Sequence, residues 1–306
     1  MIITLTGSNS FMLHQRLQKI IDVFVVEHTD MGLEKFDGGE AEFDKIRESL
    51  QSLPFLASKK LIVLRTPSIL KQFIEQAEIL LAELPETTDV ILVEPKLDKR
   101  SSYYKFLSKH SEFHEFGNLD EQNLSTWLVQ MARNNGNNLR FADARYLVER
   151  LGTNQQLLAG ELDKLSNFNS DITKENIDLL VEPTPQSTIF QLLEAALNGR
   201  TKMALKLYDE QRIQKTEPFA IIAMLAWQLH VVAIIKTAGA RSDADIASEA
   251  KLSPFVVRKS RLIADRLSFM EVKLLLDELL RLDERLKTEN IDADEALKNF
   301  LLKTSF

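Results

Sequence analysis

The strand signals in this chain stop abruptly. Short apolar runs typical of strands recur as far as Phe116, and from Leu119 onward only helical patterns follow. Before that point the runs alternate with segments whose apolar residues recur at helical spacing. Such alternation predicts a mostly parallel sheet covered by helices. The change of pattern therefore divides the chain into an α/β part and an all-α part, with a boundary near residue 120.

Five strands and four helices are expected in the α/β part. The strands are expected at 2–5, 33–36, 60–64, 90–93 and 112–116. The helices are expected at 13–24, 41–51, 69–81 and 103–108, with Ser10 as the N-cap of the first. The strand at 90–93 is uninterrupted Val-Ile-Leu-Val, as in the centre of a parallel sheet. A doubly wound α/β domain is therefore predicted for residues 1–120.

The all-α part divides again at a proline-rich segment. Residues 121–185 carry four short helical patterns and end in Val181-Glu182-Pro183-Thr184-Pro185, which is typical of a linker. Residues 186–306 are helical throughout, and the final two helices are expected at 269–287 and 293–303. The expected domains are therefore 1–120, 121–185 and 186–306.

Composition excludes several classes of function. The chain of 306 residues has no cysteine, which excludes disulfides, thiolate zinc sites and cysteine nucleophiles and fits a reducing cytoplasm. No signal peptide is visible, and no apolar run reaches the roughly 18 residues of a membrane span. The net charge is −7, with −8 in residues 1–185 and +1 in residues 186–306, so strong DNA binding by the chain alone is not expected. Protein partners are the first expectation, with nucleic acid contact at most local.

The connection before the third strand is unusually apolar for a wet loop. It reads Ser52-Leu53-Pro54-Phe55-Leu56-Ala57-Ser58-Lys59-Lys60. In one interpretation Phe55 and Leu56 fold into the core, as most large apolar residues do. In the other they form an exposed wedge, rimmed by polar residues, for a pocket on another protein. The pattern alone leaves both open.

The turn after the first strand is where a phosphate loop would lie. That loop requires G-x-x-x-x-G-K-[ST], and the turn here has Gly7 but neither the second glycine nor the lysine. The acidic residue after the central strand is Glu94, where a metal-assisted NTPase normally has Asp. The layout resembles that of an NTPase, but the chemistry is missing, so we expect no ATP hydrolysis and no bound cofactor.

No other catalytic pattern replaces it. The five histidines show no H-E-x-x-H spacing, and no G-x-S-x-G motif is present. Carboxylate pairs such as Asp283-Glu284 fall on predicted helix surfaces, where solvation is the default interpretation. We therefore expect neither catalytic residues nor a metal site.

Several separated blocks carry a family resemblance over nearly the whole chain. They are Leu53–Leu61; Lys96-Leu97-Asp98-Lys99-Arg100 with Tyr104-Lys105; Glu161-Leu162-Asp163-Lys164-Leu165; Ile189-Phe190, Ala204-Leu205 and Glu217-Pro218; Leu252-Ser253-Pro254-Phe255; and Asp283-Glu284-Arg285-Leu286-Lys287-Thr288. Together, in this order, they resemble the delta-subunit family of the bacterial DNA polymerase III clamp loader. Each block alone is weak evidence for the family, and the resemblance rests on their common order.

The resemblance implies a fold and a role. The fold is a degenerate AAA+ (P-loop-like) α/β domain, a small helical lid domain and a C-terminal helical collar domain. The role is that of a non-catalytic accessory subunit of a DNA-directed DNA polymerase, which binds and opens the beta sliding clamp for loading onto primed DNA. The implied partners are delta-prime and gamma/tau subunits in a hetero-pentamer.

The family's clamp-binding element matches Phe55 and Leu56. The order of the pair is reversed here and Pro54 precedes it, so Leu53 is included in the expected wedge. In the collar, Arg258, Lys259 and Arg261 form the one local basic cluster and are candidate DNA contacts.

Three rival interpretations remain. One is an ATP-binding clamp-loader relative, either delta-prime or a motor subunit, but those carry a cysteine-held zinc module and an S-R-C motif that this chain lacks. The second is a true P-loop-derived enzyme with an unorthodox nucleotide site. The third is a helical scaffold without any clamp role.

Overall fold

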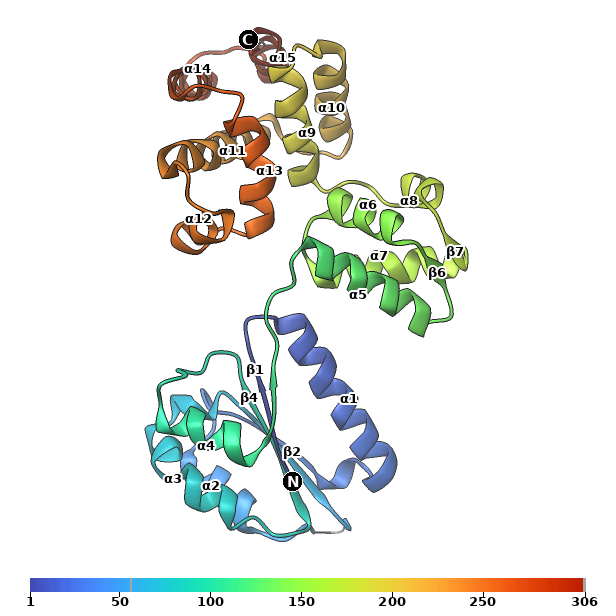
Figure 1. Ribbon diagram of the computed structural model, residues 1–306, viewed down its shortest axis with the longest axis vertical. Coiled ribbons are helices and arrows are strands. Elements are labelled where there is room, and N and C mark those ends of the chain that lie inside the picture. Colours follow the sequence, from blue (N-terminus) through green and yellow to red (C-terminus); the bar gives the residue numbers. More distant parts are fainter. Residues whose placement is uncertain (56, 305–306) are drawn as a thin grey trace. The chain divides into compact units, whose positions relative to one another are not determined.

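The first part of the chain, in the computed structural model, builds a parallel sheet whose strands lie in the order β2-β3-β4-β1-β5 (Figure 1). The strands are β1 (Ile2–Thr6), β2 (Leu33–Asp37), β3 (Lys60–Arg65), β4 (Thr88–Glu94) and β5 (Glu112–Glu115). Because every pairing is parallel, all five strands begin at one edge of the sheet and end at the other. The five predicted strands are confirmed.

Helices cover both faces of this sheet (Figure 1). One face carries α1 (Ser10–His28) and the other carries α2 (Phe43–Gln51), α3 (Lys71–Ala82) and α4 (Ser102–His110). Two short 3-10 turns, η1 (Asp30–Gly32) and η2 (Pro67–Ile69), complete the connections. The predicted α/β architecture is confirmed.

Burial on both faces explains the uninterrupted apolar runs of the central strand β4 and its neighbour β3. In β3 and β4, alternate residues face opposite layers, as the twofold period of a strand requires. Ile62 and Leu92 pack with α2, α3 and α4, whereas Val63 and Ile91 pack with α1. Both faces are buried, so neither strand has a polar side.

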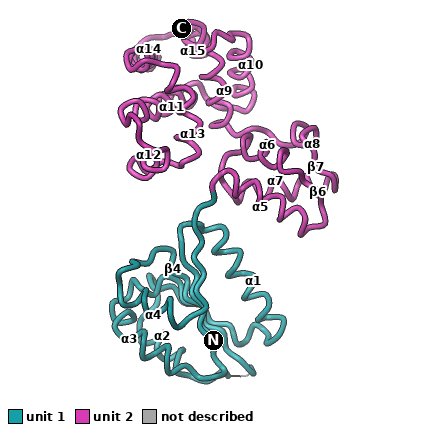
Figure 2. Tube along the Cα trace, viewed as in Figure 1, with its two compact units in different colours: residues 1–119 teal, residues 120–306 magenta. Residues whose placement is uncertain are grey.

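The structure describes residues 1–55 and 57–304, which form two compact units, 1–119 (unit 1) and 120–306 (unit 2) (Figure 2). The predicted boundary near residue 120 agrees with this division. The predicted boundary between 185 and 186 lies inside unit 2, so the separate lid and collar domains stay a prediction.

Unit 2 is built mainly from helices in the part that the structure describes. They are α5 (Glu121–Asn134), α6 (Phe141–Leu151), α7 (Gln155–Phe168), α8 (Lys174–Leu180), α9 (Pro185–Leu197), α10 (Thr201–Ile213), α11 (Pro218–Ala238), α12 (Asp243–Ala250), α13 (Pro254–Ala264), α14 (Phe269–Thr288) and α15 (Ala293–Lys303). The expectation that strands end before residue 119 is wrong in one detail. Asn138–Leu139 (β6) pairs in parallel with Asp171–Ile172 (β7).

Helix α11 is the centre of the C-terminal core and contacts α9, α12, α13, α14 and α15. Its length and composition would also suit a membrane span. Half of that apolar window is buried inside the protein, with Ile221, Leu225 and Val232 inaccessible to solvent. A core helix that is enclosed on several sides must be apolar on all of those sides, which explains the composition of α11.

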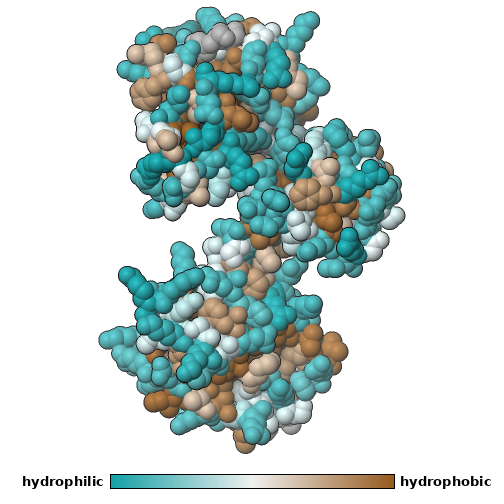
Figure 3. Space-filling model, in the orientation of Figure 1, coloured by the Kyte–Doolittle hydropathy of each residue, from teal (hydrophilic) through white to brown (hydrophobic). Residues whose placement is uncertain are grey.

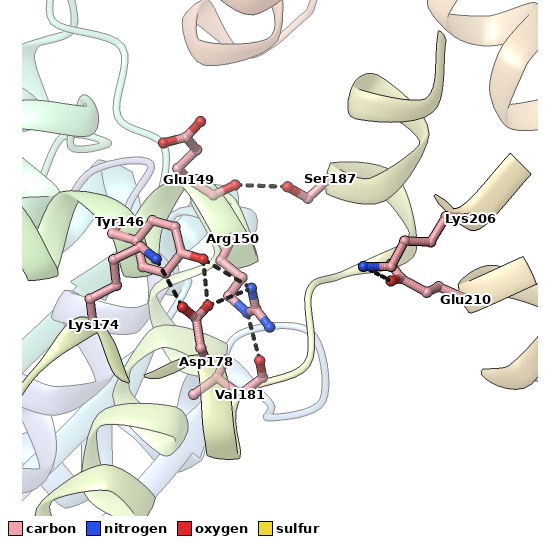
Figure 4. Close-up of polar contacts among 9 residues, drawn as sticks. All are labelled: Tyr146, Glu149, Arg150, Lys174, Asp178, Val181, Ser187, Lys206 and Glu210. Carbon is pink, nitrogen blue, oxygen red and sulfur yellow. Dashed lines mark hydrogen bonds and ion pairs between the residues drawn. The ribbon is translucent and has the colours of Figure 1, made fainter. Parts of the chain in front are cut away.

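The end of α6 joins the start of α9 within unit 2 (Figure 4). The last carbonyls of a helix have no partner inside it. Here the Glu149 carbonyl accepts from Ser187 Oγ at 2.7 Å, and the Arg150 carbonyl accepts from the Thr184 N–H at 3.1 Å. Arg150 Nε donates in turn to the Val181 carbonyl at 2.6 Å. The proline-rich segment predicted as a linker is therefore hydrogen-bonded to α6.

Candidate functional site

The apolar connection before β3, residues 53–59, is here called the tip. Leu53 is 70% exposed and Phe55 is 82% exposed, so neither side chain belongs to the core. Leu56, the third residue of the predicted wedge, lies outside the described residues. Of the two interpretations of this stretch, the exposed one holds for both residues that the structure describes.

Leaving these side chains in water has a cost. Burial of a Phe or Leu side chain contributes about 1.5–3 kcal/mol, and an exposed residue forgoes it. In the preceding helix α2, by contrast, Phe43, Ile46 and Leu50 are all buried. A large aromatic side chain held outside a filled core is typical of a protein-binding anchor.

A buried lysine closes the base of the tip. Lys60, only 3% exposed, begins β3 directly after the tip, and its Nζ donates to Ser52 Oγ directly before the tip at 2.9 Å. The same Nζ donates to the Ser49 carbonyl at 3.0 Å and pairs with Glu34 Oε1 at 3.0 Å. Ser49 Oγ donates to the other oxygen of Glu34. We call Glu34, Ser49, Ser52 and Lys60 the neck; the sequence alone indicated Lys60 as one of the exposed polar residues around the wedge.

The far end of the tip is fixed to the start of the sheet. Lys59 Nζ and the N-terminal ammonium of Met1 each lie 2.7 Å from a carboxylate oxygen of Asp89. Burial alone would raise the pKa of Asp89, but these two cations outweigh it and hold the pKa below its usual value. The backbone of Gly32 approaches so closely that a Cβ there would lie 2.2 Å from the Lys59 carbonyl oxygen. The tip thus projects from a rigid edge where the strands begin.

Other apolar side chains lie exposed near this edge. Met31 in η1 is 71% exposed and Val26 near the end of α1 is 86% exposed. Figure 3 shows apolar residues on the outer surface of unit 1 on the side of α1. Ser58 Oγ lies 3.4 Å from His28 Nδ1, which places the end of α1 against the tip. Val26 and Met31 thus add exposed apolar side chains to the segments that adjoin the tip.

The opposite edge of the sheet, where the strands end, is where a nucleotide would bind in an NTPase of this layout. Helices α1 and α4, which follow β1 and β4, cover opposite faces, so a ligand crevice would form between the ends of these strands. At the end of β1, Gly7 has φ +119° and a Cβ there would lie 2.1 Å from the Phe116 carbonyl oxygen. The Asn9 N–H, which could otherwise face an anion, donates to that carbonyl at 3.0 Å.

Asn9 also occupies the start of α1. Its Oδ1 accepts from the Met12 N–H at 3.1 Å and its Nδ2 donates to the Gly117 carbonyl at 3.2 Å. The helix N-cap is thus Asn9, and the prediction of Ser10 as the cap is wrong by one residue. The free N–H groups that let a helix start bind phosphate are partly consumed by the protein itself.

Glu94, at the end of β4, is 1% exposed and already fully engaged. Its two oxygens accept from the Ser68 N–H at 2.9 Å and Ser68 Oγ at 2.7 Å, and Tyr103 OH donates at 3.3 Å. Burial raises the pKa of Glu94, and the hydrogen bonds from Ser68 and Tyr103 oppose that rise. The carboxylate therefore joins η2 and α4 to the sheet instead of facing an open crevice. No group of three His, Asp or Glu side chains suited to a metal lies within residues 1–55 and 57–304.

Replacing Glu94 by Gln is expected to stabilise unit 1 at pH 8. A carboxyl whose pKa is higher in the folded state binds more protons when folded, so stability falls as pH rises from 4.5 toward the raised value. Glutamine removes that loss and keeps an acceptor for Ser68. Urea unfolding between pH 4 and 8 measures this. A variant with the same pH slope as the parent chain would contradict it.

The three basic residues predicted to contact DNA do not form a free cationic patch. Arg258 pairs with Glu121 at 3.4 Å, and Arg261 pairs with Asp243. Lys259 Nζ is buried without a hydrogen-bond partner among the described residues, 5.0 Å from the ring centroid of Phe190. Burial lowers the pKa of Lys259. Their contact with DNA stays a prediction.

Comparisons with known proteins give a consistent result. The family model described as DNA polymerase III, delta subunit, matches residues 4–116, and the model for the C-terminal domain of that same subunit matches residues 186–304. DNA polymerase III subunit delta of Bacillus subtilis is 25% identical over 316 residues, covering 98% of this chain and 91% of that protein.

The fold agrees with a solved structure. The Bacillus subtilis DNA clamp loader delta protein matches with a TM-score of 0.82 and 23% identity, covering 99% of this chain and 94% of that one. At this identity the structural likeness shows the fold alone. The two family models match both ends of the chain, and the Bacillus subtilis relative spans nearly all of it. The chain therefore belongs to the family of DNA polymerase III delta subunits.

Proposed function

We propose that this chain acts as a clamp-loader subunit that binds the beta sliding clamp through its tip and holds the ring open for loading onto primed DNA. The observation that carries the proposal is the exposure of Leu53 and Phe55 on a loop whose base is closed by hydrogen bonds. Leu56 completes the proposed wedge. The working complex contains delta-prime and gamma/tau subunits, and its place is the cytoplasm.

The wedge acts by binding energy alone. Aromatic and aliphatic anchors of this kind each lose about 2 kcal/mol or more when truncated, provided that they fill a pocket on the partner. A wedge favours the open ring only if it binds that form more tightly than the closed form. The clamp pocket would therefore lie close to a subunit boundary of the ring, where opening changes its shape.

The α/β domain is proposed to be a degenerate AAA+ module that leaves ATP chemistry to other subunits. Three observations support this: the absence of the phosphate-loop lysine from the sequence, the Asn9 N–H turned to the Phe116 carbonyl, and the engagement of Glu94 by Ser68. Without the lysine, and with the Asn9 N–H already bonded, the turn has little with which to hold β- and γ-phosphates.

Two measurements on the purified chain test the proposal. Surface-immobilised sliding clamp from the same organism should bind the chain with a dissociation constant at or below the micromolar range, while titration calorimetry with ATP and Mg²⁺ should show no heat of binding. Clamp binding without ATP binding supports the proposal. ATP binding would favour the delta-prime or motor-type alternative. The absence of both clamp binding and ATP binding would favour a scaffold without a clamp role.

A further inference from the structure

We propose that Lys60 is a positioning residue for the tip, because it joins the two ends of the loop and so holds Leu53 and Phe55 ready for the clamp. The inference rests on the proposed function, since it assigns a role to residues that lie beneath the same surface. It concerns the neck residues, of which Lys60 and Ser49 are buried and so cannot themselves fill a pocket on a partner.

The hydrogen bonds of Lys60 are placed to close a loop. Ser52 directly precedes the tip and Lys60 directly follows it, so the 2.9 Å bond between Nζ and Ser52 Oγ spans the base of residues 53–59. Nζ also donates to the Ser49 carbonyl, one of the last carbonyls of α2 that has no partner inside the helix. A positive charge at this end of a helix is electrostatically favourable. Glu34 on β2 pairs with the same ammonium and with Ser49 Oγ, which fixes its place.

A buried lysine is a poor choice if stability alone is at stake. Desolvation of its charge is expensive, and apolar replacement of buried ion pairs is often neutral or stabilising. What an apolar side chain cannot do is bond Ser52, the Ser49 carbonyl and Glu34 at once. The directional bonds therefore specify the geometry of the loop more than they add to the free energy of unfolding.

Closing the loop matters for binding because a free loop must lose conformational entropy when it docks. Holding the loop in its bound arrangement beforehand removes part of that cost from the binding free energy. Leu53 and Phe55 are largely exposed, so we infer that the order of the tip depends on how its two ends are held. The neck joins Ser52, before the tip, to Lys60, after it. The Lys59–Asp89 ion pair at 2.7 Å holds the last residue of the tip at the start of β4.

The test measures clamp affinity and tip mobility in the full chain for two neck variants. Lys60→Met removes all three bonds but keeps the aliphatic stem, and we expect about tenfold weaker clamp binding. Ser52→Ala removes the bond across the base and the 3.2 Å bond from Ser52 Oγ to the Ser49 carbonyl. It leaves Lys60 paired with Glu34, so the fold is retained; about threefold weaker binding is expected. Hydrogen exchange of residues 53–59 in the free chain should accelerate in both. Lys45→Met, which changes an exposed lysine of α2, is the matched control and should change neither quantity.

A double-substitution cycle separates positioning from a general loss of stability. If Lys60 acts through the tip, Lys60→Met costs about tenfold in the parent chain but less than about twofold in a Phe55→Ala background. Equal losses in both backgrounds, or no loss from either neck variant, would overturn the positioning role. Phe55→Ala alone distinguishes the two proposals: if it leaves clamp binding intact, the proposed function fails, whereas if it weakens binding and the neck variants do not, only the neck proposal fails.

Discussion

Replacing Leu53 and Phe55 by alanine together is expected to weaken clamp binding about 100-fold or more. Two exposed anchors that fill a partner's pocket each contribute about 1.5–2 kcal/mol or more, and tenfold in affinity corresponds to about 1.4 kcal/mol. The fold should be unaffected, because both side chains are already in water in the free protein. The midpoint of thermal unfolding should therefore stay within about 1 °C of the parent chain.

Two exposed isoleucines of the same unit provide the control. Ile69 is 65% exposed and Ile79 is 61% exposed, so Ile69→Ala/Ile79→Ala removes comparable apolar surface away from the tip. Binding to immobilised clamp should be unchanged in this variant. If the control loses as much affinity as the tip variant, the apolar surface acts without specificity. If the tip variant binds normally, another surface carries the clamp.

The alternation of strands and helices could be predicted because the spacing of apolar residues in each element reflects which of its faces are buried. Residues of β3 and β4 face α1 and the opposite helices in turn, and both faces are apolar. The pair of two-residue strands β6 and β7 could not be predicted, since two residues carry no period. The segment predicted as a linker, 181–185, begins in the connection between α8 and α9. Its hydrogen bonds to α6 could not be predicted, because they depend on residues distant in the sequence.

The candidate site was predictable in composition but not in exposure. An apolar stretch such as that from Leu53 to Leu56 fits a core and an interface equally, and the family resemblance alone favoured the second. What decides the matter is that Leu53 and Phe55 lie exposed, whereas Phe43, Ile46 and Leu50 of the preceding helix are buried. That is a property of packing, which no local pattern contains.

Long-range charge pairing limits sequence reasoning most. Arg258, Lys259 and Arg261 form a basic cluster in the sequence, yet Arg258 meets Glu121 across 137 positions of the chain. Lys60 is the opposite case: a lysine at the first position of a strand normally indicates a solvent-exposed strand end, yet this one is buried. Its partner Ser52 lies eight positions away, and a serine at that position gives no sign in the sequence that it accepts a hydrogen bond from Lys60.

Gly7→Ala is expected to destabilise unit 1 by about 3 kcal/mol or more. The backbone there has φ +119°, a conformation essentially reserved for glycine, and an added Cβ would lie 2.1 Å from the Phe116 carbonyl oxygen. Relief of that clash would require β1 and the segment after β5 to separate, with loss of the Asn9 N–H bond to the same carbonyl. Costs of this size arise where strain and a buried hydrogen bond are lost together.

Gly136→Ala isolates the clash from the backbone strain. Gly136 also has a positive φ, +78°, but an added Cβ there meets nothing within 4 Å, so about 1–2 kcal/mol is expected. Both tryptophans, Trp127 and Trp227, lie in unit 2, so their fluorescence during urea unfolding follows that unit, while hydrogen exchange of β1 and β4 follows unit 1. Gly7→Ala should affect only the second signal. Equal costs at both glycines would mean that the turn after β1 is free to move, as a phosphate loop is, and would count against its role as a closed structural turn.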